Sequence, residues 1–389
     1  MLLRDAKKEK NLAGIQEFQR WRVRCDLNPG FCDTRWYEQA ARECKDAPAL
    51  SFYSVGAADR DVRSAACAFT EGLSFQEEIT MNSMSFFIIL VLMTPGLAVA
   101  QQTASRPAIT GISHLTVYSD NMAKSKQFYA SLLGWDPVPA TGAGAGIRFY
   151  VNHSQYVELA TPPSPGQAWR LDHVGFSTSD AEALRRFLGA HGVAVPDAVT
   201  MEKNGDRSFL VHDPEGNKVA FVQQGDHPPT KPESAAQRLS THIIHAGYMV
   251  RNRAALDRFY KDVLGFHLYW QGGAGAGQTD WVMMQVPDGT DWIEYMLNLP
   301  DAPDKWALGS ANHMAPGVES VAALQARLEQ RGWKPAAGKN PQILGVDGKM
   351  QLDLNDPDGT RIEFMEFKPV KEPCCSAYTG PQPSASDAW

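Results

Sequence analysis

Four residues with metal-ligand side chains stand at near-symmetric spacing in the second half of the chain. They are His245, Glu294, His313 and Glu363, separated by 49, 19 and 50 residues. Each lies in or beside a strand-like apolar run, and the run DWIEYM around Glu294 is one where a lone carboxylate is costly to bury. Two imidazoles and two carboxylates are what a divalent metal site with open positions needs.

Such a site would carry out proton-transfer chemistry. A divalent ion would polarise two neighbouring oxygens of a substrate, and the adjacent α-proton would become acidic. Glu294 or Glu363 would then act as the general base that moves this proton. The ligand set suits zinc or nickel, and it also accepts iron or manganese.

The elements that must position these residues are repeated. SHLTVYSDNMAKSKQFYASLLGW contains His114, and IHAGYMVRNRAALDRFYKDVLGF contains His245; each places Phe-Tyr fourteen residues after its histidine. Two further units begin LDHVGFSTSDAEALRRFLGAHG and ANHMAPGVESVAALQARLEQRG, and they end in the matching pair HDPEGNKVAFV and NDPDGTRIEFM. Self-similarity of this kind indicates a repeated structural unit.

Each unit has the pattern of a strand, a helix and then two or three strands. Ser179 and Glu182 predict a capping box at the start of the second helix. The polar, proline-rich residues 224–240 predict a linker between the halves. The four units lie near residues 109–162, 169–223, 241–299 and 310–367.

Composition limits the class of partner. The chain has 389 residues, enough for two domains, and a formal net charge of −7. This charge gives no electrostatic reason to expect nucleic acid or an anionic membrane as a partner. We expect a small-molecule substrate, and a homodimer is compatible with the sequence.

The N-terminal hundred residues differ from the rest. Residues 1–80 show no sustained period, and we expect a non-native or disordered extension there. Residues 81–100 contain an apolar run and then Ala98-Val99-Ala100, which predicts a signal peptide cleaved near Ala100 and hence export to the periplasm or medium. Anchoring in a membrane by residues 84–100 is the alternative.

The C-terminal end is rich in proline, serine and glycine. We expect residues 369–389 to form a disordered tail. Cys374 and Cys375 lie in it, and they predict either a redox or metal-capturing feature or, as the simpler interpretation, thiols or a vicinal disulfide without function.

The four units resemble the vicinal-oxygen-chelate superfamily. The shared features are a histidine on the first strand and DPDG followed by a carboxylate on the last strand. The resemblance implies an α+β fold in which four βαβββ modules form two open eight-stranded cups. It also implies a first domain at 109–223 and a second at 241–368.

The second half is most similar to glyoxalase I. WIEYMLN, DKWALGSANH and DPDGTRIEFMEF carry the similarity, which implies that His245, Glu294, His313 and Glu363 are the metal ligands. Asn298 matches a substrate-holding position of that family, and we expect Trp281 and Trp292 to line the cup. The wider expectation is a metal-dependent, glyoxalase-like lyase or isomerase acting on a small α-oxygenated substrate. Met249 and Gly309 stand where that family often has basic residues that bind glutathione.

The first half has an incomplete set. His114, Glu158 and His173 occupy the matching places, but Ala220 replaces the last carboxylate. A structural or substrate-shaping role is therefore expected for this half.

Two other functions are kept open. His245, His313 and Glu363 alone would form the two-histidine, one-carboxylate face of an extradiol-type iron dioxygenase. However, GVDGKMQLDLNDP lacks the histidine and tyrosine that this family has before the DP turn. The third class is a metal-free binding protein with an aromatic cup, to which Tyr269, Trp270 and Trp306 would also contribute.

The arrangement of units decides which residues share a site. Because sequential elements are usually adjacent in space, we expect units three and four to pair, and this places His245 beside His313. Pairing of units one and four would instead place His114 beside His313.

Overall fold

The computed structural model describes residues 105–140, 146–225 and 235–387. The predicted extension 1–80, the predicted signal peptide 81–100 and most of the predicted linker lie outside these residues. Within the described part, no helix has both the length and the apolar character needed to span a membrane.

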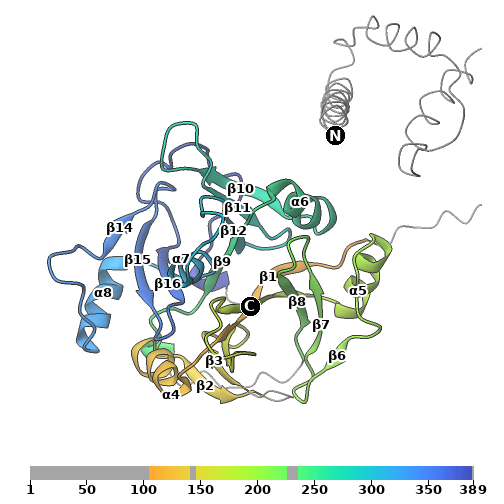
Figure 1. The fold of residues 1–389 in the computed structure, drawn as a ribbon, viewed down its shortest axis with the longest axis horizontal. Coiled ribbons are helices and arrows are strands. Elements are labelled where there is room, and N and C mark those ends of the chain that lie inside the picture. Colours follow the sequence, from red (N-terminus) through yellow and green to blue (C-terminus); the bar gives the residue numbers. More distant parts are fainter. Residues whose placement is uncertain (1–104, 141–145, 226–234, 388–389) are drawn as a thin grey trace, which may run out of the picture. The chain divides into compact units, whose positions relative to one another are not determined.

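The first half forms one eight-stranded sheet with the order β2-β3-β4-β1-β5-β8-β7-β6 (Figure 1). Units one and two supply four strands each, so neighbouring units share a sheet. The strands are β1 (Ile109–Tyr118), β2 (Asp136–Pro139), β3 (Ile147–Tyr150), β4 (Tyr156–Ala160), β5 (Leu171–Thr178), β6 (Thr200–Met201), β7 (Arg207–His212) and β8 (Lys218–Gln223).

The second half repeats this plan in the order β10-β11-β12-β9-β13-β16-β15-β14. The predicted pairing of units three and four is therefore confirmed, as are the two eight-stranded cups of the α+β fold. The strands are β9 (Ile243–Met249), β10 (His267–Gly272), β11 (Trp281–Gln285), β12 (Trp292–Met296), β13 (Met314–Val318), β14 (Gln342–Leu344), β15 (Met350–Asn355) and β16 (Arg361–Glu366).

Along each strand, successive side chains point to opposite faces of the sheet. One face packs in the core, and the other lines the cup. On β12, Ile293 and Tyr295 are fully buried in the main hydrophobic core, whereas Trp292 belongs to a smaller cluster on the other face. Glu294 shares that second face with Trp292 and Met296, because side chains two residues apart point the same way. The strand pattern thus directs one carboxylate into the cup.

The helix of each unit packs on the main hydrophobic core, to which Leu184, Leu256 and Leu324 belong. In units one and three the helix begins in α geometry and continues with π-type hydrogen bonding. The helices are α4 (Met122–Lys126) with Gln127–Leu132, α5 (Ala181–Ala190), α6 (Arg253–Asp257) with Arg258–Val263, α7 (Lys305–Ala311) and α8 (Val321–Gln330), and two short 3₁₀ turns lie at Ala235–Gln237 and Ala385–Asp387.

The predicted capping box at Ser179 is wrong. The N-cap of α5 is Asp180, whose side chain accepts a hydrogen bond from the Ala183 amide. Aspartate is as good a cap as serine, and the Ser179 hydroxyl instead accepts a hydrogen bond from the Ala108 amide. Glu182 forms an ion pair with Arg185.

The two halves pack through the turns that precede the last strands. Asp358, in the DPDG turn before β16, accepts hydrogen bonds from the Asp120 amide and the Ser125 hydroxyl of unit one, each at 3.1 Å. Asp356 in the same turn accepts a hydrogen bond from the Tyr129 hydroxyl at 3.0 Å. The strand that carries Glu363 is therefore fixed at its start by the first half.

The prediction of a disordered C-terminal tail is wrong as far as residue 387. Cys374 and Cys375 form a disulfide, and the Trp270 indole donates to the Cys374 carbonyl at 3.1 Å. The Thr379 amide donates to the Tyr269 carbonyl at 3.0 Å, so the tail runs along the β10 edge of the sheet. These backbone contacts satisfy polar groups that an edge strand otherwise leaves open, and they order the segment.

Candidate metal centre

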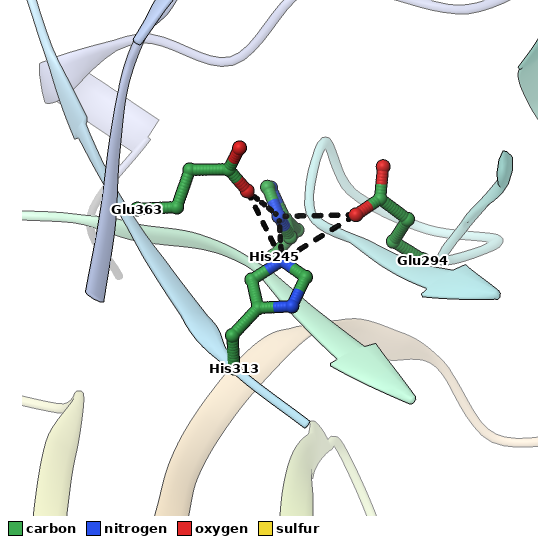
Figure 2. Close-up of side chains that lie close together, drawn as sticks. All are labelled: His245, Glu294, His313 and Glu363. Carbon is green, nitrogen blue, oxygen red and sulfur yellow. Dashed lines mark hydrogen bonds and ion pairs between the residues drawn. The ribbon is translucent and has the colours of Figure 1, made fainter. Parts of the chain in front are cut away.

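The second sheet brings the four predicted ligands together. His245 comes from β9, Glu294 from β12 and Glu363 from β16, while His313 immediately precedes β13. Figure 2 shows the four side chains converging on one point. The Nε2 atoms of His245 and His313 lie 3.0 Å apart, and Glu363 Oε2 lies 3.2 Å and 3.0 Å from them. Glu294 Oε2 lies 3.4 Å from His313 and 3.9 Å from His245.

A glycine makes room for this convergence. A Cβ at Gly247 would lie 2.1 Å from the imidazole of His313, so a larger residue there would displace the ring. The Gly247 amide also donates to the His313 carbonyl at 2.9 Å. Helix α7 ends at Ala311 with Asn312 as its C-cap, and this sets where His313 enters the sheet.

The two histidines are oriented differently. His313 donates from Nδ1 to the Ala311 carbonyl at 3.0 Å, and this fixes Nε2 as the atom directed into the cup. His245 stacks on Trp292 with ring centroids 4.9 Å apart. Its Nδ1 is buried and has no hydrogen-bond partner among the described residues. His245 is thus held by packing, and His313 by its backbone acceptor.

The site mixes buried charges of both signs. Burial opposes ionisation of Glu363, yet the Arg361 charge and the two imidazoles hold its pKa well below the usual range. Burial lowers the pKa of His245. Burial and the Arg361 charge also act against a protonated His313, but hydrogen bonds to the two carboxylates raise its pKa. Two buried carboxylates thus rely on neighbouring cationic groups.

These observations fit a divalent ion. One ligand atom from each of the four side chains lies within 4.8 Å of the others, and all four residues are buried. Ligand atoms at ~2.0–2.2 Å from one ion lie about 3–4 Å apart. The distances between the two histidine nitrogens and from each of them to the carboxylate oxygens, 3.0–3.9 Å, fall in this range. A bound ion would also supply the positive charge that two buried carboxylates need.

The two ends of the cup differ in how deeply their side chains are buried. Trp292 and Lys349 lie toward the end where the tail runs, and the Lys349 ammonium lies 5.4 Å from the centre of the Trp292 ring and 5.5 Å from that of Tyr378. Met296 is paired with Trp281 and with Met249 at the opposite end. Trp281 and Met249 are half-buried, whereas Trp292 and Lys349 are fully buried, so the end at Trp281 is the more open.

The expected substrate residues take different places. Trp281 is half-buried at the open end, whereas Trp292 is fully buried behind His245. Asn298 is exposed in the connection that follows β12. Trp306 on α7 is 63% exposed and therefore lines no enclosed cup.

Four side chains near the site were not predicted from the sequence. Arg361 lies two residues before Glu363 and donates toward it. At the closed end, Tyr378 donates to the carbonyl of Asp347 at 2.9 Å, and Lys349 packs beside it. The alternation of β16 indicates that Arg361 faces the cup, but no sequence signal places Tyr378, because the tail meets the sheet only in the folded chain.

The first sheet brings two histidines together in the same way but lacks a complete set of carboxylate ligands. The Nε2 atoms of His114 and His173 lie 2.9 Å apart. Glu158, however, is bonded at 2.8 Å by the Arg148 guanidinium, and Ala220 provides no ligand. The Arg148 guanidinium therefore lies opposite Glu158, at the position where Met283 lies opposite Glu294 in the second sheet.

The chain matches known proteins over both halves. The family model described as Glyoxalase/Bleomycin resistance protein/Dioxygenase superfamily matches residues 111–221 and 242–364. A lactoylglutathione lyase from Haemophilus influenzae is 28% identical over 130 residues, which is 33% of this chain and 95% of that protein.

Solved structures share the fold with TM-scores of 0.51. The Mn(II)-bound glyoxalase from Novosphingobium aromaticivorans is 20% identical and covers 67% of this chain and 83% of its own. Homoprotocatechuate 2,3-dioxygenase from Arthrobacter globiformis is 18% identical, and the match covers 68% of this chain and 82% of the dioxygenase. The 2,3-dioxygenase LapB from Pseudomonas sp. KL28 is 17% identical, and the match covers 69% of this chain and 97% of LapB. By its two module matches, this chain belongs to the Glyoxalase/Bleomycin resistance protein/Dioxygenase superfamily.

Proposed function

We propose that this protein is a divalent-metal-dependent lyase or isomerase of glyoxalase type, which moves a proton on a small α-oxygenated substrate. The observation that carries the proposal is the complete buried quartet His245, Glu294, His313 and Glu363. The similarity to a lactoylglutathione lyase supports the reaction class.

A divalent ion bound here would supply a Lewis acid that polarises neighbouring substrate oxygens. His245 and His313 would hold it through Nε2, and the hydrogen bond from His313 to Ala311 keeps that ring in the required tautomer. Zinc, nickel and manganese all accept this mixed nitrogen and oxygen set.

Glu294 is the better candidate for the general base. Glu363 lies 3.0–3.2 Å from both imidazoles and beside the Arg361 guanidinium, so it is firmly held by these neighbours. Glu294 lies further from the histidines, at 3.4 Å and 3.9 Å. It can therefore leave its neighbours at a smaller cost and accept the α-proton of a substrate.

Proton NMR in heavy water tests this function. The protein, stripped with a chelator and reloaded with zinc, nickel or cobalt, should exchange the α-proton of α-hydroxycarbonyl compounds for deuterium. Glu294→Gln should abolish the exchange and keep most of the metal, because two histidines and Glu363 remain. Loss of exchange in Glu363→Gln but not in Glu294→Gln would reverse the assignment of the base.

An extradiol-type dioxygenase is the second candidate. His245, His313 and Glu363 form the tightest part of the quartet, which resembles a two-histidine, one-carboxylate face. An oxygen electrode separates the two: the proton-transfer enzyme consumes no oxygen with catechols. Oxygen uptake with ring cleavage by the iron-loaded protein would decide for the dioxygenase.

A further inference from the structure

Arg361 is a cation at the open end of the cup. It lies on β16 two residues before Glu363, so both side chains point into the same face. Its side chain is 15% exposed, whereas that of Glu363 is 5% exposed. The guanidinium thus lies between the four converging side chains and the solvent side.

The donors of Arg361 are incompletely used inside the protein. Nη1 lies 3.4 Å from Glu363 Oε1 and 3.6 Å from Asp353 Oδ2, which are long distances for hydrogen bonds. Nε is buried and has no hydrogen-bond partner among the described residues. A guanidinium carries five N–H donors, so most of its capacity is left over.

The contact between Arg361 and His313 is not a well-directed hydrogen bond. Nη2 of Arg361 lies 3.0 Å from both ring nitrogens of His313. An atom equidistant from both nitrogens lies over the ring and not along the in-plane lone pair of Nε2, which points into the cup. The same lone pair would bind the proposed ion. Among the described residues, Nη2 of Arg361 therefore has no well-directed acceptor.

The opposite wall of this end is apolar. Met296 is paired with Trp281 on one side and with Met249 on the other. Met296 is 8% exposed, and the other two are half-buried. A ligand that enters here meets one cationic wall and one wall of methionine and tryptophan.

We propose that Arg361 recognises a carboxylate on the substrate, and that the substrates are α-hydroxy or α-oxo carboxylates with an apolar side group. One carboxylate oxygen and the adjacent oxygen would face the metal site, and the second carboxylate oxygen would accept from Arg361. The apolar group would lie against Trp281 and Met296. This inference rests on the proposed metal site but not on the reaction carried out there.

Binding of two matched probes tests the proposal. Mandelate is an α-hydroxy carboxylate with a phenyl group, and mandelamide is its neutral counterpart with the same hydroxyl and carbonyl oxygens. Both are titrated by calorimetry into cobalt-loaded wild type, Arg361→Met and Arg361→Lys. Lys218→Met changes the corresponding position of the first sheet and serves as the matched control.

The wild type should bind mandelate about tenfold more tightly than mandelamide, because a charge-assisted hydrogen bond is lost in the amide. Arg361→Met should weaken mandelate about tenfold and leave mandelamide unchanged, and Arg361→Lys should fall between. Lys218→Met should match the wild type. Equal binding of the two probes by the wild type, or an equal loss of both in Arg361→Met, would overturn the role of Arg361.

The cobalt absorption spectrum separates this outcome from failure of the metal site. Metal-loaded protein without preference for mandelate contradicts the substrate class alone, whereas absence of bound cobalt in the wild type contradicts the proposed function. If Arg361→Met fails to hold cobalt, the preference for mandelate over mandelamide is compared between the wild type and Arg361→Lys. A smaller preference in Arg361→Lys supports the role of Arg361, and an equal preference contradicts it.

Discussion

The Arg148 guanidinium donates a hydrogen bond of 2.8 Å to Glu158, the first-sheet counterpart of Glu294. Arg148 also donates to both carboxylate oxygens of Glu202 at 2.9 Å. A buried cation therefore takes the place that a metal ion would need, while His114 and His173 keep their Nε2 atoms 2.9 Å apart. Arg148 and Ala220 together account for the incomplete site.

Reversal of these two differences should create a second metal site. The double variant Arg148→Met/Ala220→Glu copies the second sheet, which has Met283 and Glu363 at these places. We expect two equivalents of zinc per chain by elemental analysis after dialysis, against one in the wild type. Arg148→Met alone should stay at one. A correctly folded double variant with one equivalent would contradict this account of the first sheet.

The buried pair of His242 and Asp291 predicts a pH dependence of stability. Burial disfavours a charged imidazole, but the charge and the 2.7 Å hydrogen bond of Asp291 raise the pKa of His242 above 6.5. At a pH between the unfolded-state and folded-state pKa values of His242, the folded protein holds a proton that the unfolded chain has released. This contribution is complete below pH 6.5 and is lost as the pH rises through the folded-state pKa.

Urea unfolding at about pH 6 and about pH 8.5 measures this effect. His242→Gln should lower the free energy of unfolding at both values, and by more at the lower one. The exposed His153→Gln is the control and should change little. A cost of His242→Gln that grows with pH would contradict the shifted pKa.

Tyr378 should stabilise the protein from within the ordered tail. Its hydroxyl donates to the Asp347 carbonyl at 2.9 Å and to Asp347 Oδ2 at 3.2 Å, and its ring packs on Tyr269 with centroids 4.8 Å apart. Tyr378→Phe should lower the free energy of unfolding by about 1–2 kcal/mol, and Tyr378→Ala by about 3 kcal/mol, because the latter also leaves a void.

The same urea unfolding experiment checks both variants, with the exposed tail residue Lys371→Ala as control. Equal stability of the wild type and Tyr378→Ala would show that the tail does not pack on the sheet in solution.

The repeats predicted most of the fold because each unit carries its own local signals. The DP-containing turns, the period of two and the Phe-Tyr spacing lie within single units, and neighbouring pairing followed from chain adjacency. These features were enough to predict that His245 lies next to His313. The helix start at Asp180 was missed because two good capping residues, Ser179 and Asp180, stand side by side.

Contacts between distant segments were not predictable in this way. Tyr378 reaches Asp347 over 31 residues, and Arg148 reaches Glu202 over 54 residues. Neither pair has a spacing or motif that indicates contact. Composition predicted a disordered tail, because it does not record that β10 offers open backbone groups for Thr379 to bind.

The metal content of untagged protein tests the central claim most directly. Elemental analysis after gentle purification and dialysis should find about one equivalent of divalent metal in the wild type and in His114→Ala. It should find almost none in His313→Ala and Glu363→Ala, because each removes a direct ligand from the second sheet. Unchanged metal content in both of these variants, with the fold retained, would contradict the assignment of the metal centre.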